Sequence, residues 1–418
     1  MINASTESKM QKNKIPEWDL TDLYNSPNSE KIKVDFQRAE KLSKKFSNRY
    51  KGIIKDIDGD KLGQAISEFE IISEILYKIL SYGQLLHTAD ITNEELGRFF
   101  QTVHEKVTEI SSHTLFFKLE INRLDPSILE KQMECNKADK YAPWIRDLRS
   151  FRNHQLSDEL EKILLEKSVS GRSAWIRLFD ETEARLRFPL DGKEFGISDI
   201  LNRLSDKDSN VRQNAAKVLG KVLSQNMKLF SLIINTLAKD KATEDAWRSY
   251  PKPISERNLS NQVEDHVVDA LVDSVKKSYP DLSHRYYRLK AKWFGAESLN
   301  YWDRNAPLPG DEDKTFSWGE ARQIVLDAYG SFDAKMASIA DDFFKNNWID
   351  ACPRNGKSSG AFSHSTVPSV HPYILMNFQG KARDVMTLAH ELGHGVHQVL
   401  SGPQGVLMAD TPLTTAET

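Results

Sequence analysis

The chain has 418 residues, of which 28% are charged and 39% are apolar, and its 57 basic and 60 acidic side chains leave a net charge of −3. This profile is typical of a soluble globular protein with a sizeable core, and it argues against a nucleic-acid binder that relies on a strong positive field. No apolar run approaches the roughly 20 residues that span a bilayer, and two cysteines cannot form a disulfide framework.

The N-terminal segment MINASTESKMQKNK is polar and has no apolar signal core. We therefore expect a cytoplasmic protein without a membrane or nucleic-acid partner. From Leu62 onward the apolar residues recur every three or four positions, which predicts a long amphipathic helix. The stretch 208–239 also has helical spacing.

The later part of the chain continues this pattern. Ser317 is followed three residues on by Glu320, the arrangement of a capping box at a helix start. The apolar residues of 332–348 then repeat the helical spacing. The sequence therefore predicts a mainly α fold.

Strand patterns are few. Residues 185–195 predict a small hairpin on an Asp191-Gly192 turn. Residues 360–366 and 371–378 predict a second pair of strands, which would form a small β element beside the helix that follows. We expect an N-terminal helical domain over 1–200 and a second domain over 201–418.

The segment 384–400, DVMTLAHELGHGVHQVL, predicts a helix with Asp384 as its cap. At about 100° per residue, His390 and His394 project from one face, one turn apart. Two neutral imidazoles at this spacing can hold one Zn²⁺ ion. Glu391 can take a proton from a zinc-bound water without being a ligand.

The alternative interpretation is a pair of buried core histidines. The apolar residues of this helix gather on the opposite side, which must be the core face: Val385, Leu388, Ala389, Leu392, Val396 and Val399. His390 and His394 therefore face water or a cavity, which favours the metal site.

The third ligand must come from another residue, because the chain lacks the Gly and His that a metzincin carries after its second histidine. Only two acidic residues follow His394, namely Asp410 and Glu417. Thr411-Pro412 is typical of a helix start, which would place Glu417 in the second turn, facing the first helix. We favour Glu417 over Asp410. Two histidines and a glutamate leave an open position, as in catalytic zinc sites.

The strand before this helix could bind a peptide in extended form if it lies at a sheet edge. Gly360 would allow close approach of another backbone, and Ala361 and Phe362 follow it. A simple buried hairpin is an equally good interpretation. His364 and His371 could hydrogen-bond a substrate carbonyl, although for each of them a structural role is the more common one.

The segments TLAHELGHGVHQ and TPLTTAET resemble the active-site region of the oligoendopeptidase F family, which belongs with the thimet-type zinc oligopeptidases. The resemblance covers essentially the whole chain and includes EWDLTDLY, RFPLDGKE, DRNAPL and GAF. It implies a two-lobed, zincin-type helical metallopeptidase with zinc at the floor of a deep channel, which cleaves internal bonds of short peptides. His390, His394 and Glu417 match the family's zinc ligands, and Glu391 matches its general base.

Members of this family are considerably longer. The resemblance implies that further helices of the catalytic lobe are missing, together with a His/Tyr-bearing segment that binds substrate. We therefore expect a fold that is incomplete at its C-terminus. Two hypotheses remain open: a zinc metalloendopeptidase, or an inactive fragment that at most binds peptides or a partner. A separate chain could supply the missing helices.

Overall fold

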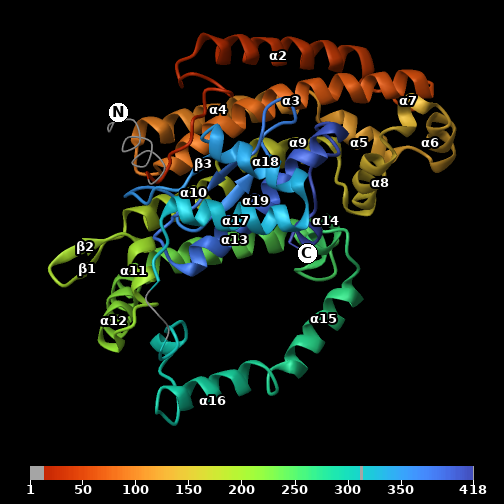
Figure 1. The fold of residues 1–418 in the computed structure, drawn as a ribbon. Helices are drawn as coiled ribbons and strands as arrows, with labels where there is room; N and C mark the ends of the chain where they lie inside the picture. Colours follow the sequence, from red (N-terminus) through yellow and green to blue (C-terminus); the bar gives the residue numbers. More distant parts are fainter. Residues whose placement is uncertain (1–13, 311–313, 418) are drawn as a thin grey trace, which may run out of the picture.

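The computed structural model describes residues 14–310 and 314–417. The chain is built almost wholly from helices, with one small sheet near its centre (Figure 1). The expected mainly α fold is confirmed. None of the helices in the described ranges is both long and apolar enough to cross a membrane.

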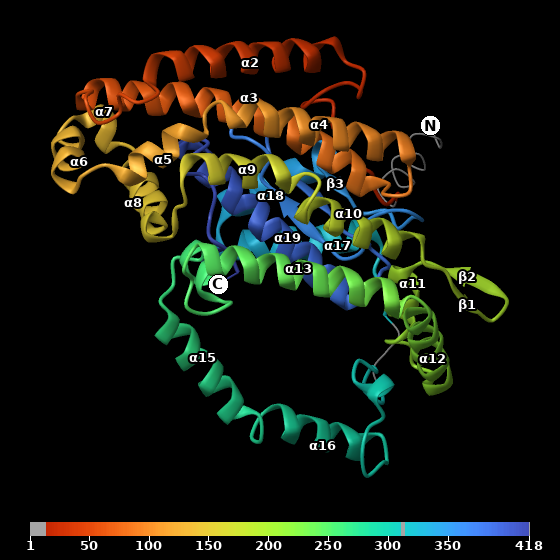
Figure 2. The same ribbon diagram turned by 180° about the vertical axis from the view of Figure 1, so that it is seen from behind.

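The first helices of the N-terminal part, α2 to α4, are stacked along one edge of the molecule, whereas α9 and α10 run across its middle (Figures 1 and 2). The long helix predicted from Leu62 is confirmed as α3, which packs against α2 and α4. The helices of this part are α2 (Glu30–Tyr50), α3 (Gly59–Ala89), α4 (Glu94–Ser112), α5 (Leu115–Arg123), α6 (Pro126–Met133), α7 (Asn136–Asp139), α8 (Ala142–Ser150), η1 (Arg152–His154), α9 (Asp158–Ser168) and α10 (Arg172–Arg185).

The predicted hairpin is confirmed as β1 (Phe188–Leu190) paired antiparallel with β2 (Lys193–Phe195). Its turn residues both have positive φ, 51° at Asp191 and 73° at Gly192. This is the backbone that a two-residue hairpin turn requires, and Asp-Gly accommodates it.

The helix predicted over 208–239 is two helices. After α11 (Ile197–Arg203), the chain forms α12 (Ser209–Gln225) and α13 (Met227–Trp247). The break is at Asn226, whose side chain donates back to the carbonyl of Val222. An asparagine that bonds to the backbone in this way competes with the helix ladder, so apolar spacing alone did not predict the break.

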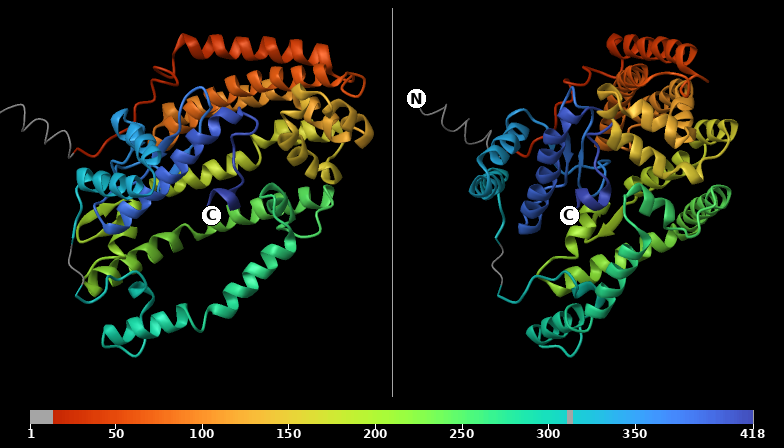
Figure 3. Two further views of the ribbon diagram at one scale, coloured as in Figure 1. Left: turned by 45° about the vertical axis from the view of Figure 1, so that its right-hand side comes forward. Right: turned by 90° about the vertical axis from the view of Figure 1, so that its right-hand side faces the viewer.

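Helices α14 (Ser255–Ser260), α15 (Asp265–Ser278) and α16 (Ser283–Trp293) lead to the short η2 (Tyr301–Asp303). Helices α15 and α16 form an arm that lies apart from the other helices (Figures 2 and 3). Helix α15 has no buried residue, although it carries apolar side chains.

The C-terminal part surrounds the small sheet. The capping box at Ser317 and Glu320 is confirmed. The helices are α17 (Trp318–Phe332), α18 (Ala334–Lys345), α19 (Ala382–Ser401), η3 (Gly402–Gln404) and α20 (Leu413–Ala416). Helices α17 and α18 pack against each other and against α19. Seen from behind, α9, α10 and α13 cross in front of α19 (Figure 2).

The sheet has the strand order β3-β5-β4. The predicted strand pair is confirmed as β4 (Phe362–His364), antiparallel to β5 (Tyr373–Leu375), although both strands are shorter than expected. The third strand, β3 (Ile349–Asp350), runs parallel to β5. Two residues are too few to show a period, so the sequence did not predict it. Strand β4 lies at an edge of the sheet.

Among residues 14–310 and 314–417, the buried apolar residues form three clusters. One lies among the N-terminal helices, a second joins α17, α18 and α19 to the sheet, and a third joins the hairpin to α11 and α12. The third cluster contains residues from both sides of the boundary expected near residue 200. The division into domains 1–200 and 201–418 stays a prediction.

Candidate metal centre

Helix α19 begins two residues earlier than the sequence predicts, at Ala382. Asp384 therefore lies inside the first turn instead of capping it. Its Oδ2 accepts from the backbone N–H groups of Gln379 and Lys381, both at 2.9 Å. A carboxylate in this position stabilises the start of the helix through the free N–H groups and the helix dipole.

The buried apolar face of α19 sets how this helix is turned about its axis, and it is the face that the sequence predicts. Val385, Leu388, Leu392 and Val396 are all buried. The hydroxyl of Tyr329, from α17, donates to the carbonyl of Ala389. These contacts leave the side of α19 that carries the two histidines outside the core.

His390, His394 and Glu417 converge. The Nε2 atoms of the two histidines lie 3.0 Å apart. Oxygens of Glu417 lie 3.4 Å from Nε2 of His390 and 3.5 Å from Nε2 of His394. Ligands that bind one tetrahedral Zn²⁺ at about 2.0–2.1 Å are about 3.3 Å from one another. The donor set and its spacing therefore fit a single zinc ion.

Glu417 directly follows the single turn of α20, which begins at Leu413. It is thus not in a second turn, and Thr411 does not cap the helix. The Thr411 hydroxyl instead lies 3.4 Å from Nε2 of His397. The hydroxyl of Thr414 donates to the carbonyl of Asn261, beyond α14, at 2.9 Å. This contact helps to hold α20 over the histidines.

Glu391 is buried, with 6% of its surface exposed. Burial raises the pKa of its carboxyl above the ordinary value; Glu417 adds to this rise, whereas His390 opposes it. Within the described residues, its side chain forms no hydrogen bond. A partly desolvated carboxylate that is free to bond is suited to exchanging protons with a neighbouring group.

The residues predicted to bind a peptide lie on and beside the edge strand. Gly360 has φ 80°, and a Cβ placed there would meet no heavy atom within 4 Å, so its surroundings are open. Ala361 and Phe362 are half-buried. These positions are compatible with a peptide along β4, which stays a prediction.

His364 and His371 are not part of the metal cluster. The ring of His371 stacks on Trp348 with centroids 3.6 Å apart, and its Nε2 lies 2.9 Å from Oδ2 of Asp22. Nε2 of His364 is buried and has no partner. Both histidines line a separate cavity beyond the C-terminal end of α19.

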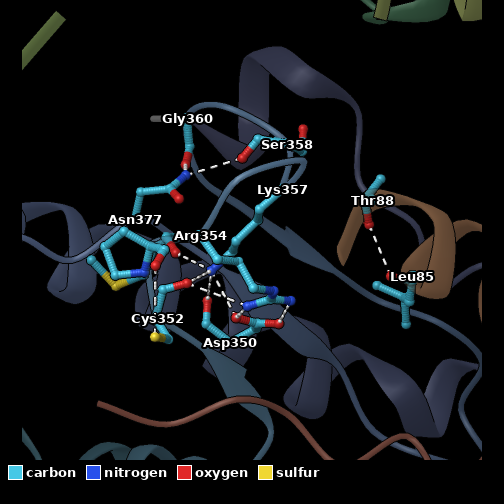
Figure 4. Close-up of polar contacts among 11 residues, drawn as sticks. Leu85, Thr88, Asp350, Cys352, Arg354, Lys357, Ser358, Gly360 and Asn377 are labelled. Atoms are coloured by element: carbon cyan, nitrogen blue, oxygen red, sulfur yellow. Dashed lines mark hydrogen bonds and ion pairs between the residues drawn. The ribbon is translucent and has the colours of Figure 1, made fainter. Parts of the chain in front are cut away.

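Sequence reasoning missed a buried charged cluster that supports the sheet (Figure 4). Nζ of Lys357 donates to Oδ1 of Asp350 at 2.7 Å and to the carbonyl of Met376 at 2.6 Å. Arg354 pairs with both oxygens of the same aspartate, each at 2.7 Å. The lysine and the aspartate have no exposed side-chain surface. A buried ion pair is tolerated only when its charged atoms also have hydrogen-bond partners. No local sequence pattern predicts this cluster.

The loop that contains Arg354 and Lys357 leads from β3 into β4. The side-chain amide of Asn377 donates to the carbonyls of Ser358 at 3.0 Å and Gly360 at 3.1 Å (Figure 4). The backbone N–H of Ser358 donates to the carbonyl of Thr88, at the end of α3, at 2.9 Å. These bonds fix the edge strand to both the sheet and the N-terminal helices.

The structure thus combines a mainly helical fold with a histidine-bearing helix beside a small sheet, as expected from the sequence. The chain belongs to peptidase family M3, whose sequence profile matches residues 203–418. A second profile, described as oligopeptidase F, matches residues 120–188. The resemblance noted in the sequence is therefore confirmed.

Two curated relatives illustrate the similarity. The chain is 27% identical over 423 residues to oligopeptidase PepF of Bacillus subtilis (strain 168), covering 96% of this chain and 61% of the relative. It is 25% identical over 398 residues to an oligoendopeptidase F homolog of Borreliella burgdorferi, covering 93% of this chain and 65% of the relative. The chain thus spans 61–65% of the length of these relatives.

Solved structures have the same fold. Oligoendopeptidase-F from Enterococcus faecium matches with a TM-score of 0.61 and 22% identity, over 76% of this chain and 62% of that chain. PZ peptidase A with an inhibitor matches with a TM-score of 0.70 and 15% identity, over 94% of this chain and 67% of that chain.

Proposed function

We propose that this chain carries the catalytic centre of a cytoplasmic, zinc-dependent endopeptidase that hydrolyses internal bonds of short peptides. Membership of peptidase family M3 supports the reaction class. The names of the relatives, oligopeptidase and oligoendopeptidase, support short peptides as the substrate. The single observation that carries the proposal is the convergence of His390, His394 and Glu417, with ligand atoms all within 4.8 Å of one another.

The two imidazoles and the Glu417 carboxylate would hold the zinc ion and leave one coordination position open. A zinc ion bound there supplies a Lewis acid that polarises the scissile carbonyl and lowers the pKa of water. The two histidines differ in exposure: 54% of the His390 side chain is exposed, but only 16% of the His394 side chain. Substrate would therefore approach from the His390 side.

Glu391 is the proposed general base. It follows His390 directly on the same helix, and its buried carboxylate forms no hydrogen bond within the described residues. It would take a proton from the attacking water as the new C–O bond forms. It would then deliver that proton to the amide nitrogen as the C–N bond breaks, which returns the carboxylate to its starting state.

Peptide positioning is assigned to the edge strand β4. Backbone groups on the free edge of a strand can pair with an extended peptide. Gly360 leaves open space at the beginning of this segment. A substrate held in this way has an extended backbone, which favours short, unfolded peptides over folded proteins.

The test is cleavage of an internally quenched oligopeptide by the purified chain, with chelator and with zinc added back. Chelator should abolish cleavage and zinc should restore it. Glu391→Gln should keep one zinc per chain and lose cleavage, whereas His394→Gln should lose the zinc. His266→Gln is the control, because His266 is exposed on α15 and lies outside the cluster. Cleavage that survives in Glu391→Gln would refute the assignment.

A second candidate is that this chain is inactive alone and works only with a second polypeptide. The observation that favours it is α15, which has no buried residue and exposes 64% of Leu271. We infer that a separate polypeptide covers this apolar face of α15. Cleavage that appears only when such a chain is added would support this candidate, and binding of a hydrophobic dye to the isolated chain should then fall.

A further inference from the structure

A cavity of about 790 Å³ lies between the N-terminal helices and the C-terminal end of α19. Its walls come from α3, α5, α18, the loop after β4 and the segment after α19. Gln398, one of its lining residues, is four positions beyond His394, which is about 6 Å along the helix axis. None of the proposed zinc ligands lines it, so it is separate from the metal centre.

Lys118, on α5, lines this cavity. Its ammonium lies over the ring of Phe69, 5.5 Å from the ring centroid. Within the described residues it has no carboxylate partner and no hydrogen bond. Burial lowers the pKa of this lysine, and no nearby charge offsets the shift. Lys118 is half-buried, and its ammonium is paired with no carboxylate of the described cavity wall, so it would attract an anion that entered the cavity.

His364 contributes a second unpaired donor to the same cavity. Its Nδ1 accepts a long hydrogen bond, 3.5 Å, from the backbone N–H of Thr366. Burial lowers the pKa of His364 to about 4, so the ring is neutral at pH 7. A neutral ring whose Nδ1 accepts carries its proton on Nε2. That Nε2 is buried and has no partner, which is rare for a buried polar atom.

The remaining lining favours a group with one negative charge. Asp342 and Asp410 also line the cavity, but both are exposed, and neither forms an ion pair with Lys118. They would repel any anion, and a dianion such as phosphate about twice as strongly as a singly charged carboxylate. Trp144 and Trp348 provide apolar surface. A carboxylate beside an apolar side chain therefore matches the cavity better than an inorganic phosphate does.

We propose that this cavity is a carboxylate-binding site, in which Lys118 supplies the charge and the Nε2–H of His364 a second hydrogen bond. The ligand is the carboxylate of a peptide, either its C-terminus or an acidic side chain. The assignment does not depend on zinc or on hydrolysis. It concerns a second binding site on the same chain.

The test is isothermal titration calorimetry on the chelator-treated chain, so that cleavage cannot contribute. Three probes are compared: acetyl-Gly-Ala-Leu with a free carboxylate, the same peptide as its amide, and acetyl-Gly-Glu-Leu amide. If a carboxylate forms a charged hydrogen bond with Lys118, at least one of the two carboxylate probes should bind about tenfold tighter than the uncharged amide. Which of the two does so identifies the source of the carboxylate.

Lys118→Met should remove this preference, and Lys118→Arg, which retains the charge, should preserve it. Lys106→Met is the matched control, because Lys106 also lies over an aromatic ring, 5.6 Å from that of Phe36, but does not line the cavity. Far-UV circular dichroism checks the fold of each variant. Equal binding of all three probes, no binding of any, or a preference that persists in Lys118→Met would each overturn the assignment. Failure of peptide cleavage alone would leave it standing.

Discussion

Gly395 lies directly against the ring of Phe343, so that a Cβ atom at this position would be 2.7 Å from Cζ of the phenylalanine. The contact joins α19 to α18 one residue after His394. Both elements belong to the cluster of buried residues around the sheet. The close approach of the two helices, and hence the position of the histidines, depends on the absence of a side chain here.

Gly395→Ala should therefore destabilise the fold, even though alanine is the better helix former. The ring of Phe343 is buried and cannot move away freely, so we expect a loss of about 1–3 kcal/mol in the free energy of unfolding. Urea unfolding monitored by circular dichroism measures it. Gly220→Ala is the control, since Gly220 also lies within a helix but has nothing within 4 Å of a Cβ. It should be neutral or stabilising by up to about 1 kcal/mol. Equal behaviour of the two variants would contradict the packing argument.

The identity of the third zinc ligand gives a second prediction. Glu417→Gln should weaken zinc binding by more than the 10–100-fold that loss of an outer-shell partner costs. Asp410→Asn should have little effect, because Asp410 lies outside the His390, His394 and Glu417 cluster. Competition with a chelating dye measures both affinities. A larger loss in Asp410→Asn than in Glu417→Gln would reverse the assignment.

His364 should make stability depend on pH. Its folded pKa of about 4 lies below the ordinary histidine value, so only the unfolded chain takes up a proton as the pH falls through about 6.5. This group therefore lowers stability as the pH falls from about 6.5 towards 4. Between pH 7.5 and pH 5 the expected loss is up to about 2 kcal/mol.

His364→Asn should remove that part of the pH dependence, since the asparagine oxygen can still accept from Thr366. Urea unfolding at the two pH values measures the difference. His266→Asn, at an exposed site on α15, is the control and should behave as the original chain does. A variant His364→Asn with the original pH dependence would show that this histidine is protonated normally in the folded state.

The sequence predicted those features that depend on a few neighbouring residues. The Asp191-Gly192 turn and the Ser317 capping box are local, and both formed as expected. The core face of α19 also followed from its spacing, because only one rotation of that helix buries Leu388 and Leu392.

Features that depend on distant contacts were not predictable. The break at Asn226 results from one side-chain hydrogen bond, and β3 exists only because it pairs with β5. Lys118 and His364 lie far apart in the sequence yet line one cavity. Residue type can suggest that His364 is functional, but only the fold shows which cavity it lines.

The base of the arm depends on a buried ion pair. Arg212, on α12, is 2% exposed, and its Nη2 lies 2.6 Å from Oδ1 of Asp303, in η2 after α16. Its Nη1 also donates to the carbonyls of Asp206 and Lys207, at 2.7 and 2.8 Å. The guanidinium therefore joins α12 to the point where the arm returns to the body.

Arg212→Met should cost about 3–5 kcal/mol, because it leaves the Asp303 carboxylate buried without its partner. The double variant Arg212→Met/Asp303→Asn should recover part of this loss, since the remaining group is uncharged. Arg123→Met is the control: its pair with Asp158 is 47% and 40% exposed, and such surface pairs contribute at most about 1 kcal/mol. Urea unfolding measures stability, and hydrogen exchange should rise in residues 283–306. If exchange there stayed unchanged while stability fell, the pair would stabilise α12 without anchoring the arm.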